Sequence, residues 1–428
     1  MPDDMLLLIV CRFLLKHSVE ACLSTTCSTE CPSDPDATGD MSGDPRVPGD
    51  MCRINALPDD ILLLILSYLN ARQVVQTCVL SLQWRNLWRS VPRINATPDE
   101  FEDMSDEYGE YTVLFKEFLN RFLMLRNPVA LDEFELWYDM PWDSDDYSED
   151  ANLWICHALH CNARSIMVWV RDNSLRLDPV VFLPGRFLRR LHLTSVILPP
   201  GFFCQLGTGC KALKYLILHT CDISDVEITS KTLKVLTMGI DCHYTFEEQC
   251  SISIPSLVHL NYFTYRRIPL LKNMKSLERA FAVLNTYHTE VDDIRQFLKS
   301  ITGITDLNFS YNRHMLNMGN IQWCPKFNNL TTLTLSQWCL HPDFYPLIVF
   351  LQNSPSLENL TLKLRGVGHT HQRFIGELEE RSFSCEHLDS VDIVCWGVQE
   401  LDPVLDNLVE LLTENGIEPD EIHISISQ

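Results

Sequence analysis

One motif, L-x-x-L-x-L, recurs along most of this chain from about residue 130 onward. Its fourth and sixth positions alternate with polar residues, which predicts a short strand with one apolar face. A single unit of this size cannot bury that face alone, so consecutive copies must stack on one another. The clear copies are LRRLHL (188–193), LKYLIL (213–218), LKVLTM (233–238), LVHLNY (257–262), ITDLNF (304–309), LTTLTL (330–335), LENLTL (357–362) and LDSVDI (388–393).

The spacing of the copies identifies the kind of repeat. Clear copies begin 20 to 47 residues apart, and a weaker copy at 277–282 divides the longest interval into 20 and 27. Repeats of 20–29 residues with this signature are typical of leucine-rich repeats. An Asn or Cys three residues after the last leucine occurs in only some copies, at Cys221 and Asn312. We therefore predict an irregular solenoid. Further weak copies are LDEFEL (131–136), ARSIMV (163–168) and PDEIHI (419–424).

Helical segments are expected between some of the strands. Three stretches have helical periodicity, at 290–301, 343–354 and 400–416. The last is the best signalled, because Pro403 suits a first turn and Gly416 suits a helix end.

A second feature is an unbroken apolar row, Ile61 to Leu66, within a stretch that predicts three short helices. Pro58 and the two acidic residues after it favour a helix start, and Asn70 precedes a second helix over about 71–79. Ser81 is expected to cap a third helix. Three helices within 40 residues cannot bury this much apolar surface, so one face is predicted to be an interface.

This stretch resembles a plant F-box. The resemblance rests on LPDDIL (57–62), ILSYL (65–69), TCVLS (77–81) and WRNLW (84–88) at fixed spacings. It implies docking to the Skp-type adaptor of a cullin-based ubiquitin ligase. One departure is Leu82-Gln83, where plant members usually have basic residues. The residues expected to bind the adaptor are Leu57, Pro58, Ile61, Leu62, Ile65, Leu66, Leu69, Val79, Trp84, Leu87 and Trp88.

The expected fold is α/β, with a three-helix F-box followed by an irregular leucine-rich-repeat solenoid, or horseshoe. Residues 2–15 repeat the sequence of 58–70 without the helices that should follow. The predicted layout is a disordered extension carrying this partial duplicate (1–50), the F-box (51–95), an acidic linker and helix (96–130), and the repeats (131–428). The last part, about 384–428, resembles the FBD-type module of plant F-box proteins and is expected to cap the solenoid.

Charge and cysteine content exclude several classes of partner. The net charge of −23 disfavours binding to nucleic acid. The apolar run at 5–15 is too short to span a membrane, and the acidic start is atypical of a signal peptide. We therefore expect a reducing compartment, nuclear and/or cytoplasmic, with the 17 cysteines as free thiols. The cysteine clusters at 22–31 and 156–161 lack a CxxC pair, so no metal site is expected.

The chain has no phosphate-binding loop, nucleophile elbow or zinc-protease motif, so we expect no catalysis and no cofactor. The resemblance implies a substrate-recognition subunit of an SCF-type (Skp adaptor, cullin, F-box) E3 ubiquitin ligase, binding an unknown protein substrate through its repeats. Two alternatives are a small-molecule sensor similar to plant hormone receptors and a non-ligase scaffold. The sensor requires a basic pocket for an inositol phosphate, and no dense Lys/Arg patch is visible in the sequence.

The substrate is expected on the strand face that points away from the leucines. Histidines with a pKa near 6.5 at these positions predict capture that strengthens as the pH falls toward 6. The residues expected to contact an acidic or phosphorylated substrate are Arg190, His192, Tyr215, His219 and His259.

Overall fold

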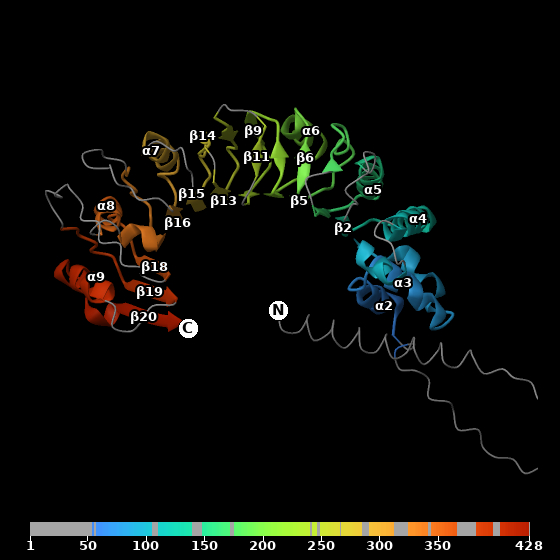
Figure 1. Cartoon of the computed structure of the whole chain (residues 1–428), viewed down its shortest axis with the longest axis horizontal. Helices are drawn as coiled ribbons and strands as arrows, with labels where there is room; N and C mark the ends of the chain where they lie inside the picture. Colours follow the sequence, from blue (N-terminus) through green and yellow to red (C-terminus); the bar gives the residue numbers. More distant parts are fainter. Residues whose placement is uncertain are drawn as a thin grey trace, which may run out of the picture. The chain divides into compact units, whose positions relative to one another are not determined.

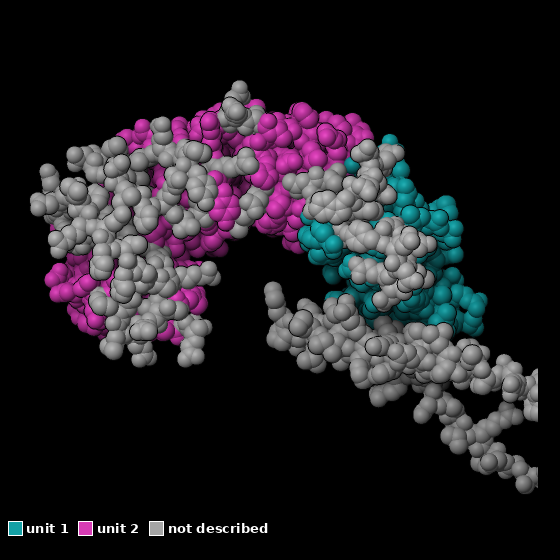
Figure 2. Space-filling model, in the orientation of Figure 1, with its two compact units in different colours: residues 1–172 teal, residues 173–428 magenta. Residues whose placement is uncertain are grey.

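The fold comes from a computed structural model, which describes residues 54, 57–104, 110–138, 148–171, 175–239, 242–245, 249–265, 267–284, 291–311, 324–340, 344–365, 382–396 and 403–427. The predicted extension, 1–50, lies outside these residues. The chain divides into two compact units, residues 1–172 and 173–428 (Figure 2). The three short helices thus share a unit with the segment predicted as an acidic linker and with the first strands.

Unit 1 begins with the three short helices and continues into strands and longer helices. Its elements are α2 (Asp59–Leu66), α3 (Ala71–Gln76), η2 (Thr77–Val79), η3 (Trp84–Ser90), β1 (Arg93–Ala96), η4 (Pro98–Met104), α4 (Glu110–Leu125), β2 (Glu133–Tyr138), α5 (Ser148–His160) and β3 (Ser165–Val170).

The helix starts follow the sequence in part. Asp59 and Asp60 occupy the first turn of α2, where carboxylates complement the helix dipole. Asn70 precedes α3, and its backbone N–H donates to Gln73 Oε1 at 3.3 Å. The prediction that Ser81 caps the third helix is wrong. That helix is a 3₁₀ segment that begins at Trp84, and the Ser81 hydroxyl has no hydrogen-bond partner.

The strands of unit 1 pair in parallel in the order β1-β2-β3. Their buried side chains face α4 and α5 through an aromatic cluster in which Phe115, Tyr138 and Trp154 make pairwise ring contacts at 5.3 to 6.2 Å. Trp154 also donates its indole N–H to Asn120 Oδ1 at 2.7 Å, which satisfies its polar atom.

Unit 2 contains the clear repeats. Its long sheet is formed by β5 (Arg190–Thr194), β7 (Tyr215–His219), β10 (Val235–Met238), β13 (His259–Thr264), β15 (Arg279–Leu284), β16 (Asp306–Tyr311), β17 (Thr332–Ser336), β18 (Asn359–Arg365), β19 (Ser390–Trp396) and β20 (Ile422–Ser427). Short strands form two smaller sheets: β4 (Leu175–Arg176), β6 (Val196–Leu198), β8 (Asp222–Ile223) and β11 (His243–Tyr244), and β9 (Glu227–Thr229), β12 (Ser251–Ser253) and β14 (Leu270–Lys272). The helical elements are α6 (Phe202–Gly209), α7 (Val291–Ser300), η5 (Gln337–Leu340), α8 (Tyr345–Gln352), α9 (Pro403–Glu414) and η6 (Pro419–Glu421).

The strands of the long sheet follow one another in chain order and pair in parallel, as a solenoid requires. The register places like motif positions side by side. Leu191 is paired in register with Leu216, Leu216 with Leu236, and Leu236 with Leu260, and all four side chains are buried. The predicted α/β class and the repeat solenoid are therefore confirmed, and the weak copies at 131–136, 163–168, 277–282 and 419–424 also contribute strands.

Helices α6, α7, α8 and α9 lie on one side of this sheet, and no described helix of unit 2 covers the other side (Figure 1). The three predicted inter-strand helices correspond to α7, α8 and α9. Gly416, just past α9, adopts a φ of 91°, which favours glycine. Neighbouring repeats are also joined by Asp225, whose carboxylate accepts from the N–H groups of Gly201 and Phe203 at 2.5 and 3.0 Å, at the start of α6.

Candidate partner-binding surfaces

The apolar row of α2 is divided between core and surface. Leu62 and Leu66 are fully buried, whereas Ile61 is 43% exposed and Leu64 is 47% exposed. After α3, Val79 is 61% exposed and Leu82 is 79% exposed. We call Ile61, Leu64, Val79 and Leu82 the F-box patch. Four exposed large apolar side chains in this short stretch make it a candidate site of protein interaction.

Gln83 joins the segment before η3 to the start of α2. Its Nε2 donates to the backbone oxygen of Leu57 at 3.1 Å and to Asp59 Oδ1 at 2.9 Å. These bonds bring Leu82 next to the start of α2, where Pro58 is exposed and Leu57 is partly exposed. At positions 82–83, where basic residues were expected, the chain thus has an exposed leucine and a glutamine that hydrogen-bonds within the domain.

Burial narrows the predicted adaptor-binding set. Six of its members are buried and hold the three helices together, so their side chains have little surface left to offer a partner; these are Leu62, Leu66, Leu69, Trp84, Leu87 and Trp88. Adaptor contact by these six residues stays a prediction; in the isolated chain Trp84, Leu62 and Leu66 have no exposed surface. Leu57, Pro58, Ile61, Ile65 and Val79 keep accessible surface. Leu64 and Leu82 are exposed but were not in the predicted set, because an all-round apolar stretch does not reveal which side chains face outward.

The second surface is the open face of the long sheet. Strand register places Arg190 beside Tyr215, then Val235, then His259. The Arg190 guanidinium lies over the Tyr215 ring, 5.2 Å from its centroid, in a cation–π contact. His259 is two strands away from Tyr215, so the structure does not bring it into contact with that pair.

His192 and His219 form a second pair on the same face. Their ring centroids lie 5.3 Å apart in an edge-to-face arrangement. The His219 ring also occupies the space beside Gly239, where a Cβ would lie 1.8 Å from His219 Nδ1. This close approach explains why residue 239 has no side chain.

The electrostatic environment of this pair overturns the predicted pH dependence. Burial, and secondarily the neighbouring His219, lowers the pKa of His192 to about 4. Burial also lowers the pKa of His219. The prediction that His192 gains charge and strengthens capture as the pH falls toward 6 is therefore wrong, because a pKa of about 4 keeps it neutral in that range, and burial lowers the pKa of His219 in the same direction.

The cysteine and histidine cluster at 156–161 forms two separate pairs at the C-terminal end of α5. Cys156 Sγ lies 3.5 Å from His160 Nδ1, and Cys161 Sγ lies 3.5 Å from His157 Nε2. Burial raises the pKa of the Cys161 thiol and, together with Arg126 and His160, lowers the pKa of His157. Within the described ranges, no three His, Cys, Asp or Glu side chains are grouped to hold a metal ion. The cluster at 22–31 lies outside those ranges.

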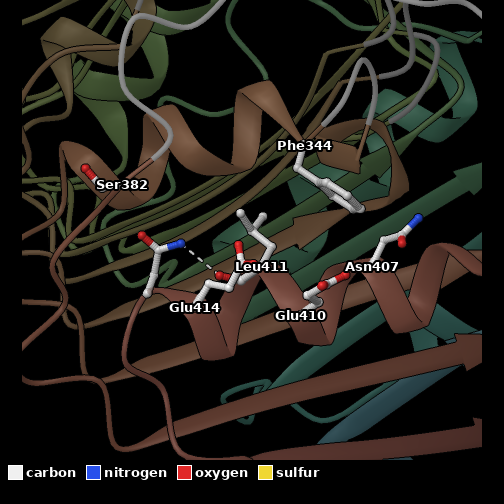
Figure 3. Close-up of a pocket in the computed structure, with 7 residues that line it drawn as sticks. Phe344, Ser382, Asn407, Glu410, Leu411 and Glu414 are labelled. Carbon is white, nitrogen blue, oxygen red and sulfur yellow. Dashed lines mark hydrogen bonds between the residues drawn. The ribbon is translucent and has the colours of Figure 1, made fainter.

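A cavity of about 540 Å³ lies between α8 and α9 (Figure 3). Asn407, Glu410, Leu411 and Glu414 of α9 line it, together with Phe344, Ser382 and Asn415. Asn415 Nδ2 donates to the Leu411 carbonyl at 2.8 Å, so this amide is used within the helix end. Two carboxylates and no basic group among these residues give the cavity the wrong charge for an inositol phosphate.

No helix in the described part of the chain is long and apolar enough to cross a membrane. The described cysteines are free thiols, and most are buried or partly buried.

Three short helices with an exposed apolar patch, followed by stacked parallel repeats, define an F-box/leucine-rich-repeat protein. Comparison with known families agrees with this class. The F-box domain family matches residues 54–95, and the family described as "At1g61320/AtMIF1, LRR domain" matches residues 162–394. Because the second match covers more than half of the chain, the protein belongs to this leucine-rich-repeat family and carries an F-box before the repeats.

Similar proteins from Arabidopsis thaliana are named for F-box, LRR or FBD domains. The chain is 26% identical to F-box/LRR-repeat protein At1g06630, over 72% of this chain and 84% of the relative. It is 29% identical to F-box/FBD/LRR-repeat protein At4g26340, over 73% and 77% respectively. FBD-associated F-box protein At4g13985 is 26% identical over 72% and 76%. The predicted resemblance to plant F-box/leucine-rich-repeat proteins is thus confirmed, including relatives with an FBD module.

Proposed function

We propose that this protein is the substrate-recognition subunit of an SCF-type E3 ubiquitin ligase. F-box domains in general bind Skp-type adaptors, and proteins with this combination of domains are typically non-catalytic. In the proposed complex the F-box binds the adaptor and, through it, a cullin. The repeats hold a protein substrate, and other subunits carry out the ubiquitin chemistry. The chain accelerates that transfer by proximity.

The observation that carries the proposal is the F-box patch. Ile61 and Leu64 lie on the outer side of a helix whose other side is fully buried, and Leu82 is held beside the start of that helix by Gln83. A cluster of apolar anchors at the centre of an interface provides most of its binding free energy.

The proposal is tested by adaptor binding. Replacing both Leu57 and Pro58 by Ala is expected to weaken adaptor binding by more than about tenfold, because buried anchors contribute about 2 kcal/mol or more each. The chain offers a matched control in a second Leu-Pro pair on unit 2, in which Leu183 is exposed and Pro184 is partly exposed. The same double substitution there is expected to leave adaptor binding unchanged. If the unmodified protein and both double variants bind the adaptor with equal affinity, Leu57 and Pro58 are not part of the adaptor interface.

Substrate capture is assigned to the open face of the long sheet, which includes Arg190 and Tyr215. Arg190→Glu with His219→Ala is expected to change the set of proteins captured in cells while adaptor binding persists. An unaltered set places recognition elsewhere on the chain. We propose a nuclear and/or cytoplasmic location, where such ligases act.

The small-molecule alternative is less well supported, since the cavity between α8 and α9 is acidic rather than basic. A non-ligase scaffold differs from the proposed receptor in one measurable property: it does not co-purify with a cullin when the adaptor is present.

A further inference from the structure

Cations align along one edge of the long sheet. Each residue immediately before β5, β7 and β10 is basic: Arg189, Lys214 and Lys234. The backbone N–H of Lys214 donates to the Arg189 carbonyl at 2.9 Å, and that of Lys234 donates to the Lys214 carbonyl at 2.8 Å. Neighbouring strands are about 4.8 Å apart, so the three residues form a row spanning about 10 Å.

Three further basic residues occupy equivalent positions in the same repeats. Arg186, Lys211 and Lys231 each lie four residues before the start of the same strands. All six side chains are exposed. We call Arg186, Arg189, Lys211, Lys214, Lys231 and Lys234 the basic edge.

Among the described residues, the side chains of the basic edge take part in no salt bridge. In the part of the chain that the structure describes, the salt bridges join other side chains, at Arg93, Lys116, Arg121, Arg164 and Arg295. Lys211 donates to the Gly207 carbonyl at 2.8 Å, and the Arg186 guanidinium lies 4.7 Å from the centroid of the Phe187 ring. Neither contact supplies negative charge. Six like charges at this spacing repel one another, and an anionic partner relieves that repulsion.

Apolar side chains accompany the cations. Val180, Leu183 and Phe187 are exposed in the segment that leads into Arg189, and Tyr215 is exposed beside Arg190 on the neighbouring strand. A partner that covers this region therefore gains by burying apolar groups as well as by neutralising charge.

We propose that the basic edge binds an acidic or phosphorylated segment of the ubiquitination substrate, with an apolar residue beside the acidic ones. This inference rests on the proposed function for the identity of the partner. A row of about 10 Å matches about three residues of an extended peptide. Phosphate oxygens form strong charge-assisted hydrogen bonds with Arg and Lys. The net charge of −23 repels a long polyanion or an anionic membrane, whereas a short segment meets only the local positive charge.

The test is direct binding by the full chain without its adaptor. The probe is a short fluorescent peptide in which phosphoserine and aspartate alternate with leucine, measured by anisotropy at physiological salt. Lys214→Glu with Lys234→Glu is expected to weaken binding by more than about tenfold. The control, Lys326→Glu with Lys363→Glu, makes the same charge change at exposed positions of unit 2 outside the basic edge. It is expected to change affinity by less than about twofold.

Three results overturn the proposal: no binding of the peptide to the unmodified protein, equal loss in both double variants, or tighter binding of a short RNA or of phosphatidylserine vesicles that is lost in the same variant. Adaptor binding is measured in parallel on each protein. Peptide binding without adaptor binding refutes the ligase function and leaves the anion site in place, whereas the reverse result refutes only the basic edge.

Discussion

Leu82 offers the most direct test of which F-box residues face a partner. Its side chain is 79% exposed, whereas that of Leu62, in the same domain, is fully buried. Complete burial of a leucine side chain contributes about 1.5–3 kcal/mol. If the adaptor covers Leu82, the substitution Leu82→Ala removes most of that contribution. We expect a loss of about 1.5 kcal/mol, or about tenfold in the dissociation constant.

Leu62→Ala provides the matched comparison. It removes the same atoms from a closed core and is expected to lower the free energy of unfolding by about 2–5 kcal/mol. Leu82→Ala is expected to leave the free energy of unfolding within about 0.5 kcal/mol of the original value. Isothermal titration with the purified adaptor gives the affinities, and denaturant unfolding gives the stabilities.

Two outcomes refute the reasoning. An unchanged dissociation constant for Leu82→Ala removes this residue from the interface, and with it the role we assign to the Gln83 hydrogen bonds. A stability loss in Leu82→Ala equal to that of Leu62→Ala contradicts the division of the domain into a buried and an exposed apolar surface.

Three further predictions concern other parts of the chain. A protein that starts at Met51 is expected to bind the adaptor with an affinity within about twofold of that of the full chain. The reason is that a helix as short as the duplicate at 2–15 is marginal in water without partners. A several-fold loss of affinity in the same titration assigns the duplicate a role in adaptor binding. Folding lowers the pKa of His192 to about 4, so the unfolded chain binds this proton at a higher pH than the folded chain, and the protein loses stability as the pH falls from about 6.5 toward 4. The melting temperature of His192→Gln is expected to decrease less over that window than that of the unmodified protein. Identical pH profiles of the melting temperature contradict the lowered pKa. Gly239→Ala is expected to lower stability because its Cβ would lie 1.8 Å from His219 Nδ1, and the cost is expected to shrink when His219→Ala is also present; additive costs in denaturant unfolding contradict steric contact.

The repeat pattern predicted the scaffold well because it is set by local alternation. The motif LRRLHL becomes β5 with Leu191 and Leu193 buried, and even LERAFA, which has one leucine, becomes β15 in register with its neighbours. Each strand requires only that apolar and polar residues alternate, and the stacking of neighbouring repeats then sets the strand order and register.

The surfaces were harder to predict because they combine residues that are far apart in the chain. Arg189, Lys214 and Lys234 are separated by 25 and 20 residues, so they do not form a dense patch in the sequence. Parallel register aligns them, and comparing the repeats position by position reveals the row. The lowered pKa of His192 comes first from burial between repeats and second from His219, which belongs to the next repeat.

The separation of leucine positions from open-face positions has an evolutionary consequence. In each strand the leucines are enclosed by neighbouring repeats, while the residues between them, such as Arg190 and Tyr215, touch only the surface. A lineage can therefore exchange the residues of the open face one at a time without unfolding the scaffold. Repeat proteins built on this framework can therefore differ in their open-face residues while keeping the same buried leucine positions.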